Sequence, residues 1–278
     1  MTRTLADALR EGARRLGGPS GRLDARLLLE EVTGLDRAAM IACERDVLDD
    51  GADRRFEALL ARRATGEPVS QILGRREFYG RTFRVTSDVL TPRPETEMLV
   101  EAALEALPPG GRVLDAGTGS GCLLLSVLAE RPDATGRGFD VSEAALAVAA
   151  VNAAGVGVTA RAALSQDRFE TFSETGFDVL VCNPPYIAEA ADLPADVRHF
   201  EPAGALFAGT DGLDAYRVLA SKAPGWLSPG GAAFFEIGAG QGEAVAALMR
   251  RGFGAPCDVS VLPDLAGLDR MIAVRTGR

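Results

Sequence analysis

The chain has 278 residues, 47% of them hydrophobic and 25% charged, which is enough apolar sequence for one large domain or two modest ones. It contains four widely separated cysteines without a CxxC pair, so the sequence indicates neither a disulfide framework nor a metal site. The N-terminal residues mix acids and bases, and apolar residues nowhere run on for about 18 positions. We therefore expect no signal peptide, no membrane association and a cytoplasmic protein.

Charge is distributed unevenly along the sequence. The formal net charge is -9 and the sequence pI is about 4.9. Residues 1–85 carry 16 basic and 14 acidic side chains, a net of +2, whereas residues 86–278 carry 14 basic and 25 acidic side chains, a net of -11. Binding of nucleic acid depends largely on cations that neutralise phosphates. We therefore expect no stable binding of nucleic acid.

Residues 1–70 have the pattern of a small helical bundle. Leu5 and Leu9 fall on one face at helical spacing, and a second helix is expected to end at Gly34. Asp50 is the expected N-cap of a further helix. The sequence thus predicts a separate helical domain at the N-terminus.

Residues 71–91 change to β-branched and aromatic residues with turn signals, which predicts a hairpin linker. Pro94 then suits the first position of a helix that we expect to reach about Leu107, because the carboxylates of Glu95 and Glu97 favour the positive N-terminal end. Residues 92–278 are predicted to form the second domain.

Strands and helices alternate after Gly111, the pattern of a mainly parallel sheet covered on both faces. Helices are expected after Gly121, after Ser142, from about Leu213 and after Gly240. The strands are expected at these positions: 112–114, 136–140, 158–162, 177–182, 232–237, and two near Val259 and Met271.

The residues Gly117, Thr118, Gly119, Ser120 and Gly121 follow an apolar strand and open a helix, where an open α/β sheet binds its ligand. A dinucleotide fingerprint would place its third glycine one residue later, so this spacing suits a nucleoside ligand without a pyrophosphate. Asp140 ends the next strand, about 20 residues on, where a carboxylate accepts hydrogen bonds from both ribose hydroxyls. Either feature alone also fits a tight turn or a solvated acid, but together they predict an adenosyl site.

A second motif, Asn183-Pro184-Pro185-Tyr186, stands at the end of the apolar strand 177–182. Two prolines make a stiff loop whose carbonyl oxygens are free to accept hydrogen bonds, and Asn183 adds a side-chain oxygen. Two fixed acceptors can hold both hydrogens of an NH2 group and turn a delocalised lone pair toward a methyl donor. Tyr186 adds an aromatic face. The motif predicts methylation of a planar, weakly nucleophilic nitrogen, and a plain Pro-Pro turn is the structural alternative.

The sequence, including these two motifs, resembles the release-factor glutamine methyltransferases of bacteria over almost its whole length. The resemblance rests on both motifs above and on further short stretches. These are Gly66-Glu67-Pro68, Arg76-Glu77-Phe78-Tyr79, the run from Thr91 to Glu97, Phe200-Glu201-Pro202, Glu236-Ile237-Gly238 and Gln241-Gly242.

The resemblance implies an N-terminal helical domain that recognises the substrate and a seven-stranded Rossmann-like methyltransferase domain whose last strand is antiparallel. It implies S-adenosyl-L-methionine as the methyl donor, with the adenine beside Asp167, Arg168 and Phe169. The family carries Trp where this chain has Arg168, although Arg also stacks on planar rings. The implied acceptor is the glutamine of the Gly-Gly-Gln motif in class I peptide chain release factors, which act in translation termination. We expect Asn183 to contact both cofactor and acceptor, and the protein to be a monomer.

Two other functions remain compatible with the motifs. The first is methylation of the exocyclic amine of adenine in nucleic acid, which needs a flipped base and a positively charged groove. The second is a nucleotide-responsive binding module that has lost catalysis. The acidic charge disfavours the first, and the intact tetrad disfavours the second.

Some conspicuous residues are expected to have structural roles. His199 has no catalytic partner nearby in sequence, Trp226 is expected in the core, and Cys182 is expected in a buried strand. Paired arginines two helical turns apart form either a solvated face or a stripe that contacts a partner. They are Arg54, Arg55, Arg62 and Arg63.

Overall fold

The computed structural model describes residues 3–277, and none of the helices in that range is both long enough and apolar enough to cross a bilayer. The chain forms two compact units. One comprises the chain up to Arg75 together with Pro194–Phe200, and the other comprises Arg76–Leu193 and the chain from Glu201 onward. Each unit has its own hydrophobic core.

The first unit is built from helices around a core that includes Leu28, Phe56 and Leu60. Asp49, not Asp50 as predicted, caps its longest helix: Asp49 Oδ1 accepts from the backbone N–H groups of Gly51 and Ala52, at 2.8 and 2.9 Å. The helices are α1 (Leu5–Leu16), α2 (Gly21–Thr33), α3 (Arg37–Ala42), α4 (Asp50–Ala64), α5 (Val69–Leu73) and α9 (Ala195–Phe200).

Helix α9 belongs to this unit although it lies more than 120 residues further along the chain than α5. Gln71 Nε2 donates to the backbone oxygen of Phe200 at 2.6 Å. His199 is exposed on α9. The sequence pattern contains no signal for this long-range association.

A two-stranded hairpin is formed by β1 (Arg75–Phe78) and β2 (Arg81–Arg84). Its turn needs two left-handed residues, and Tyr79 and Gly80 have φ of 50° and 69°. The rings of Phe78 and Phe83 meet edge to face at 6.0 Å. Both rings are buried in a core cluster of the second unit.

The second unit contains a seven-stranded sheet in the order β5-β4-β3-β6-β7-β9-β8. β9 is antiparallel to both of its neighbours, and the pairs from β5 through β7 are parallel, which confirms the predicted fold class. The strands are β3 (Arg112–Ala116), β4 (Thr135–Asp140), β5 (Ala162–Gln166), β6 (Phe177–Cys182), β7 (Leu227–Glu236), β8 (Cys257–Pro263) and β9 (Asp269–Thr276).

Strand β5 begins at the last residue of the predicted strand 158–162. Val158 instead follows the left-handed Gly157 that ends α8, and its N–H donates to the Ala153 oxygen of that helix. Residues 159–161 form a turn. The β-branched residues Val158 and Thr159 favour a strand at the predicted position, whereas the edge strand in the structure contains no β-branched residue.

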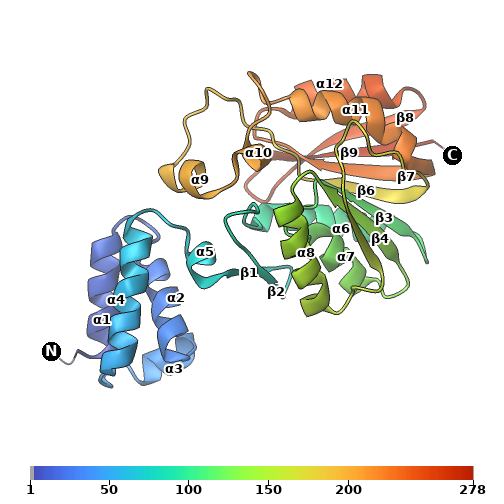
Figure 1. The fold of residues 1–278 in the computed structure, drawn as a ribbon. Helices are drawn as coiled ribbons and strands as arrows, with labels where there is room; N and C mark the ends of the chain where they lie inside the picture. The colour runs from blue at the N-terminus through green and yellow to red at the C-terminus, as the bar shows by residue number, and fades with distance from the viewer. Residues whose placement is uncertain (1–2, 278) are drawn as a thin grey trace. The chain divides into compact units, whose positions relative to one another are not determined.

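Helices cover both faces of the sheet, as Figure 1 shows. Alternation along β6 explains why: Val179 and Val181 enter a core with α6 and α7, whereas Leu180 and Cys182 enter a core with α11 and α12. The helices of this unit are η1 (Pro94–Thr96, one 3-10 turn), α6 (Glu97–Ala106), α7 (Cys122–Glu130), α8 (Glu143–Val156), α10 (Ala203–Leu206), α11 (Asp214–Trp226) and α12 (Gly242–Phe253).

The chain winds in opposite directions on the two sides of β3, because β4 lies on one side of it and β6 on the other. The carboxyl ends of these three parallel strands therefore meet at a topological switch point, where open α/β sheets bind ligands. Both sequence motifs stand at this edge.

Candidate functional site

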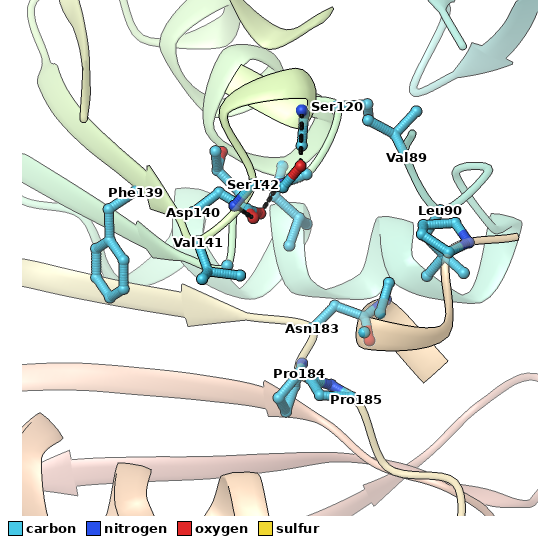
Figure 2. Close-up of a pocket in the computed structure, with 18 of the residues that line it drawn as sticks. Val89, Leu90, Ser120, Phe139, Asp140, Val141, Ser142, Asn183, Pro184 and Pro185 are labelled. Atoms are coloured by element: carbon cyan, nitrogen blue, oxygen red, sulfur yellow. Dashed lines mark hydrogen bonds between the residues drawn. The ribbon is translucent and has the colours of Figure 1, made fainter. Parts of the chain in front are cut away.

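A cavity of about 320 Å³ lies at the carboxyl ends of β3, β4 and β6. Figure 2 shows Asp140 and Ser142 near Ser120, with Asn183, Pro184 and Pro185 across the pocket. The wall is made by five segments of the second unit and seven further residues. The segments are 88–93, 117–120, 139–142, 167–170 and 183–185, and the further residues are Thr96, Cys122, Leu123, Ala145, Pro202, Gly204 and Ala205.

The glycine loop is shaped by left-handed backbone at Gly117, Gly119 and Gly121, with φ of 75°, 53° and 81°. The N–H groups of Gly117 and Thr118 both donate to the backbone oxygen of Phe139, at 2.9 Å. A side chain on Gly119 would meet nothing within 4 Å, whereas one on Gly121 would lie 2.8 Å from Leu125 Cδ1. Gly119 thus leaves open space, and Gly121 packs the loop onto its helix.

Asp140 joins the glycine loop to the start of α8. Its Oδ2 accepts from Gly119 N and its Oδ1 accepts from Ser142 N, both at 2.9 Å. Each carboxylate oxygen accepts more than one hydrogen bond, so both keep capacity for a donor in the cavity. Ser142 also caps α8 as predicted, accepting from Ala145 N at 3.2 Å.

Asp115 stabilises the glycine loop through hydrogen bonds. Its Oδ2 accepts from Thr118 Oγ1 at 2.7 Å and from Leu124 N at 3.3 Å, while its buried Oδ1 has no partner. Burial raises the pKa of Asp115 to about 7, because removal from water disfavours the carboxylate. No role was predicted for this residue from the sequence.

The segment 167–170 closes one side of the cavity. Asp167 N donates to the Asp140 backbone oxygen at 3.0 Å, which fixes this segment against the end of β4. The Phe169 ring lies 3.4 Å from where a Gly117 side chain would begin, and it meets Phe139 edge to face at 6.0 Å. Arg168 is exposed at the cavity wall. Phe169 therefore supplies apolar aromatic surface beside the glycine loop.

Asn183 lines the opposite end of the cavity. Its Nδ2 donates to Thr96 Oγ1 at 3.4 Å, and its buried Oδ1 has no partner among the described residues. A buried carbonyl oxygen without a hydrogen bond is costly, so it marks a place where a donor from a ligand would be favourable. Pro184 and Pro185 line the cavity beside it and cannot donate.

Tyr186, the last residue of the tetrad, does not line the cavity. Its hydroxyl donates to Glu236 Oε1 at 3.4 Å, and its backbone oxygen accepts from Gln241 Nε2 at 3.0 Å. Burial, followed by the nearby charge of Glu236, raises the pKa of Tyr186 to about 12. The phenol therefore stays protonated and available as a donor near neutral pH.

Glu236, at the end of β7, is 2% exposed and accepts from Thr96 Oγ1 at 2.5 Å. Burial is the main cause that raises its pKa to about 7, and the Thr96 hydrogen bond opposes it. Thr96 is also 2% exposed. These two buried polar residues lie 140 positions apart in sequence and were not predicted as site residues.

An ion pair between the partly exposed Arg93 and the buried Glu201 fixes the segment before α6 against the segment before α10. Arg93 Nη2 donates to both oxygens of Glu201, at 2.8 and 2.7 Å, and the Glu201 side chain is 2% exposed. Burial raises the pKa of Glu201, which Arg93 opposes. Arg93 and Pro202 both line the cavity, so this pair shapes its rim.

Most of the site residues expected from the sequence meet in this one cavity. Gly121 and Tyr186 do not line it: Gly121 supports the loop, and Tyr186 contacts Glu236. Further residues of the site were not predicted from the sequence; they are Thr96, Glu201, Glu236, the wall segment 88–93, Pro202, Gly204 and Ala205. Thr96, Glu201 and Glu236 lie inside stretches that carried the family resemblance, which was the only available signal.

The sheet order, the glycine loop facing Asp140 and the neighbouring Asn-Pro-Pro-Tyr motif together define a methyltransferase domain. Family models agree: residues 94–206 match the methyltransferase small domain, and residues 7–74 match the PrmC N-terminal domain. A methyltransferase from Pyrococcus furiosus shares the fold, with a TM-score of 0.54 and 15% identity over 78% of this chain and 98% of that one.

The relatives identify the family. The chain is 51% identical to the release factor glutamine methyltransferase of Cereibacter sphaeroides, over 97% of this chain and 98% of the relative. It is 43% identical to the one of Rhodospirillum rubrum, over 98% and 85%. The chain therefore belongs to the release factor glutamine methyltransferase family, as the sequence resemblance predicted.

Proposed function

We propose that this protein transfers a methyl group from S-adenosyl-L-methionine to the side-chain amide nitrogen of the glutamine in the Gly-Gly-Gln motif of class I release factors. The observation that carries the proposal is the unpartnered Oδ1 of Asn183, buried at one end of a cavity whose other end presents Asp140. One end suits an amide donor, and the other suits a nucleoside.

The residues at the nucleoside end fit the proposed cofactor. Gly119 leaves open space, both Asp140 oxygens retain acceptor capacity for ribose hydroxyls, and Phe169 offers apolar surface to the adenine. We assign Gly117, Thr118, Ser120, Gly121, Asp167 and Arg168 to the same half of the site. When bound, the cofactor supplies an electrophilic methyl group on a sulfonium.

At the acceptor end, Asn183 Oδ1 and a backbone oxygen of the Pro184-Pro185 segment would each accept one hydrogen of the glutamine NH2. This grip turns the nitrogen lone pair toward the methyl group, and it strengthens as the nitrogen becomes positive. No strong base is needed before transfer, because the excess proton is acidic once the methyl has arrived. Asn183 would also border the cofactor, and Tyr186 would act from behind by donating to Glu236.

We further propose that residues 1–70 recognise the release factor, that residues 71–91 link the two domains, and that residues 92–278 carry the methyltransferase. The protein would act as a cytoplasmic monomer without stable nucleic acid binding. In the arginine stripe, Arg62 and Arg63 are paired with Glu67 and Asp24, whereas Arg54 is exposed. Arg54→Glu should therefore raise KM for the release factor more than it lowers kcat.

The test is methyl transfer from labelled S-adenosyl-L-methionine to a purified release factor and to a version with the Gly-Gly-Gln glutamine replaced by alanine. We expect label on the first and none on the second. Absence of transfer to the unmodified factor, in the presence of measurable cofactor binding, would contradict the proposal.

A further inference from the structure

A chain of hydrogen bonds, buried at Thr96 and Glu236 and partly buried at the tetrad, connects β7 with Asn183. Asn183 Nδ2 donates to Thr96 Oγ1 at 3.4 Å, and Thr96 Oγ1 donates to Glu236 Oε2 at 2.5 Å. The other oxygen of Glu236 accepts from Tyr186 at 3.4 Å. These contacts bring three elements together: η1, the end of β6 and the end of β7.

The direction of this chain follows from the number of hydrogens. A threonine hydroxyl has one hydrogen, and a carboxylate at 2.5 Å takes it in a charge-assisted bond. The hydroxyl can then only accept from Asn183, so the amide must turn its NH2 toward Thr96. The carbonyl oxygen of Asn183 is thereby left without a partner among the described residues, on a side chain that belongs to the cavity wall.

The orientation matters because an amide has two nearly isosteric ends. With the NH2 end of Asn183 facing the cavity, two donors would oppose each other when a substrate NH2 entered. With the carbonyl facing the cavity, the substrate NH2 meets an acceptor. Like-to-like pairing in a buried site leaves polar groups unsatisfied, which costs binding and catalysis.

Resting on the proposed function, we propose that ionised Glu236, acting through Thr96, is a positioning residue that fixes the side-chain amide of Asn183 with its oxygen toward the acceptor. In this proposal both residues act through Asn183, because they determine which end of its side-chain amide meets the acceptor. Protonated Glu236 can instead donate to Thr96, which then has its hydrogen free for the Asn183 oxygen, and the amide can turn over.

The ionisation of Glu236 should therefore make the rate of methyl transfer depend on pH. Burial raises its pKa to about 7, so the ionised form that fixes Asn183 is present above that pH and is lost as the pH falls through it. The charged and titratable groups that act on Glu236 are Tyr186, Arg270 and Glu95, and the thiols of Cys122 and Cys182 lie within its electrostatic influence. Of these, Arg270 favours the ionised form and Glu95 opposes it.

The experiment compares wild type with T96V, T96S and E236Q, using a release factor as acceptor. S126A serves as a matched control, because Ser126 is a fully buried hydroxyl in α7 without a hydrogen-bond partner. Four quantities are measured: kcat, KM for the release factor, affinity for S-adenosylhomocysteine by calorimetry, and the pH profile. Thermal melts establish that each variant is folded.

We expect T96V and E236Q to lower kcat about 10-fold or more, the size of one misdirected buried hydrogen bond. KM for the release factor and affinity for S-adenosylhomocysteine should change less than about threefold. We propose that residues 1–70 recognise the release factor and that the glycine loop and Asp140 hold the cofactor, and neither substitution alters these groups. T96S keeps the hydroxyl and should stay within about threefold of wild type in kcat. Wild-type activity should fall as the pH decreases through about 7, and E236Q should lack that fall.

Three results would overturn the inference: a wild-type profile that is flat around pH 7, T96V with the kcat of S126A, or E236Q with an unchanged decline at low pH. The wild-type profile needs no variant, so a misfolded variant does not leave the matter open. Failure of the proposed function is a different result, because wild type would then bind S-adenosylhomocysteine and transfer no methyl group to the release factor.

Discussion

The two ends of the cavity are built in different ways. At the nucleoside end, backbone N–H groups donate to residues close in sequence: Gly119 N donates to the Asp140 carboxylate, 21 positions away, and Gly117 N donates to the Phe139 backbone oxygen. At the acceptor end, the bonds run between side chains far apart in sequence, from Asn183 to Thr96 over 87 positions and from Thr96 to Glu236 over 140.

This difference has a functional consequence. A backbone loop with fixed donors suits a ligand that is the same in every turnover. A side-chain relay suits an acceptor amide whose two ends must be distinguished, because the relay sets which atom of Asn183 faces the cavity. Cofactor binding and acceptor positioning should therefore be separable by mutation.

The largest expected effect concerns the two buried carboxylates, one at each end. Asp115 and Glu236 have ordinary pKa values of 3.8 and 4.5, and burial raises both to about 7. Between about pH 4 and 7 the folded chain then binds more protons than the unfolded chain, so the free energy of unfolding should fall as pH rises through that window, by roughly 3 to 4 kcal/mol per group at most.

Urea unfolding of wild type, D115N and E236Q at several pH values measures this slope. In each variant the free energy of unfolding should lose the part of its pH dependence that the replaced carboxyl group contributes. D133N is the control, because Arg131 holds the pKa of exposed Asp133 below its ordinary value and outside the window. A wild-type stability that rises between about pH 4 and 7 would refute the burial argument.

The next effect is loss of cofactor affinity in D140A. The substitution removes an acceptor for two backbone N–H groups and, in our proposal, for both ribose hydroxyls. We expect S-adenosylhomocysteine to bind roughly 100-fold more weakly by calorimetry, since each hydrogen bond to a carboxylate contributes about 1.5 to 3 kcal/mol. D133A, at the opposite end of β4, should bind like wild type, and equal affinities for D140A and D133A would contradict the assignment.

Replacing Asn183 with alanine should act on the other end. Loss of one acceptor contact of about 1 to 3 kcal/mol predicts a kcat roughly 10- to 100-fold lower. Because Asn183 is proposed to border the cofactor as well, its affinity for S-adenosylhomocysteine should fall, but by less than about threefold. A variant with wild-type kcat would remove Asn183 from the acceptor site, and a larger loss of affinity than of kcat would place it with the cofactor alone.

The smallest effect distinguishes two glycines of the same loop. G119A and G121A both force a left-handed φ on alanine, at about 1 to 2 kcal/mol, but only Gly121 is crowded, with Leu125 at 2.8 Å and Ala149 at 3.3 Å. G121A should therefore unfold more easily than G119A, by about 1 kcal/mol in chemical denaturation. Equal stability of the two variants would show that Leu125 moves aside without cost.

The nucleoside end of the site was easier to predict from the sequence than the acceptor end. The glycine loop and Asp140 were predictable, because strand, turn and helix follow one another with fixed spacing. The tetrad was predictable as a motif, but the hydrogen bond from the Tyr186 hydroxyl to Glu236 was not, because it joins residues 50 positions apart. No local pattern connects Thr96 with Glu236, since only the folded sheet brings η1 beside β7.

The fold shows a similar limit. The order of strands and helices was predictable from alternation, and β3, β4 and β6 lie within about two residues of their predicted bounds, whereas β7 begins at Leu227, before the predicted strand 232–237. The edge strand β5 was displaced, because its sequence from Ala162 to Gln166 has neither alternation nor β-branched residues. Adjacent acids gave no basis for choosing Asp49 over Asp50 as the cap of α4.

The most direct test of the central claim is a competition for one limiting portion of labelled S-adenosyl-L-methionine between a release factor and single-stranded DNA rich in adenine, followed by mass-spectrometric mapping of the methyl group. Both acceptors present a planar NH2 group that the tetrad could hold. We predict that the methyl group is found on the glutamine of the Gly-Gly-Gln motif and not on adenine. Methylated adenine, with an unmodified release factor, would contradict the account.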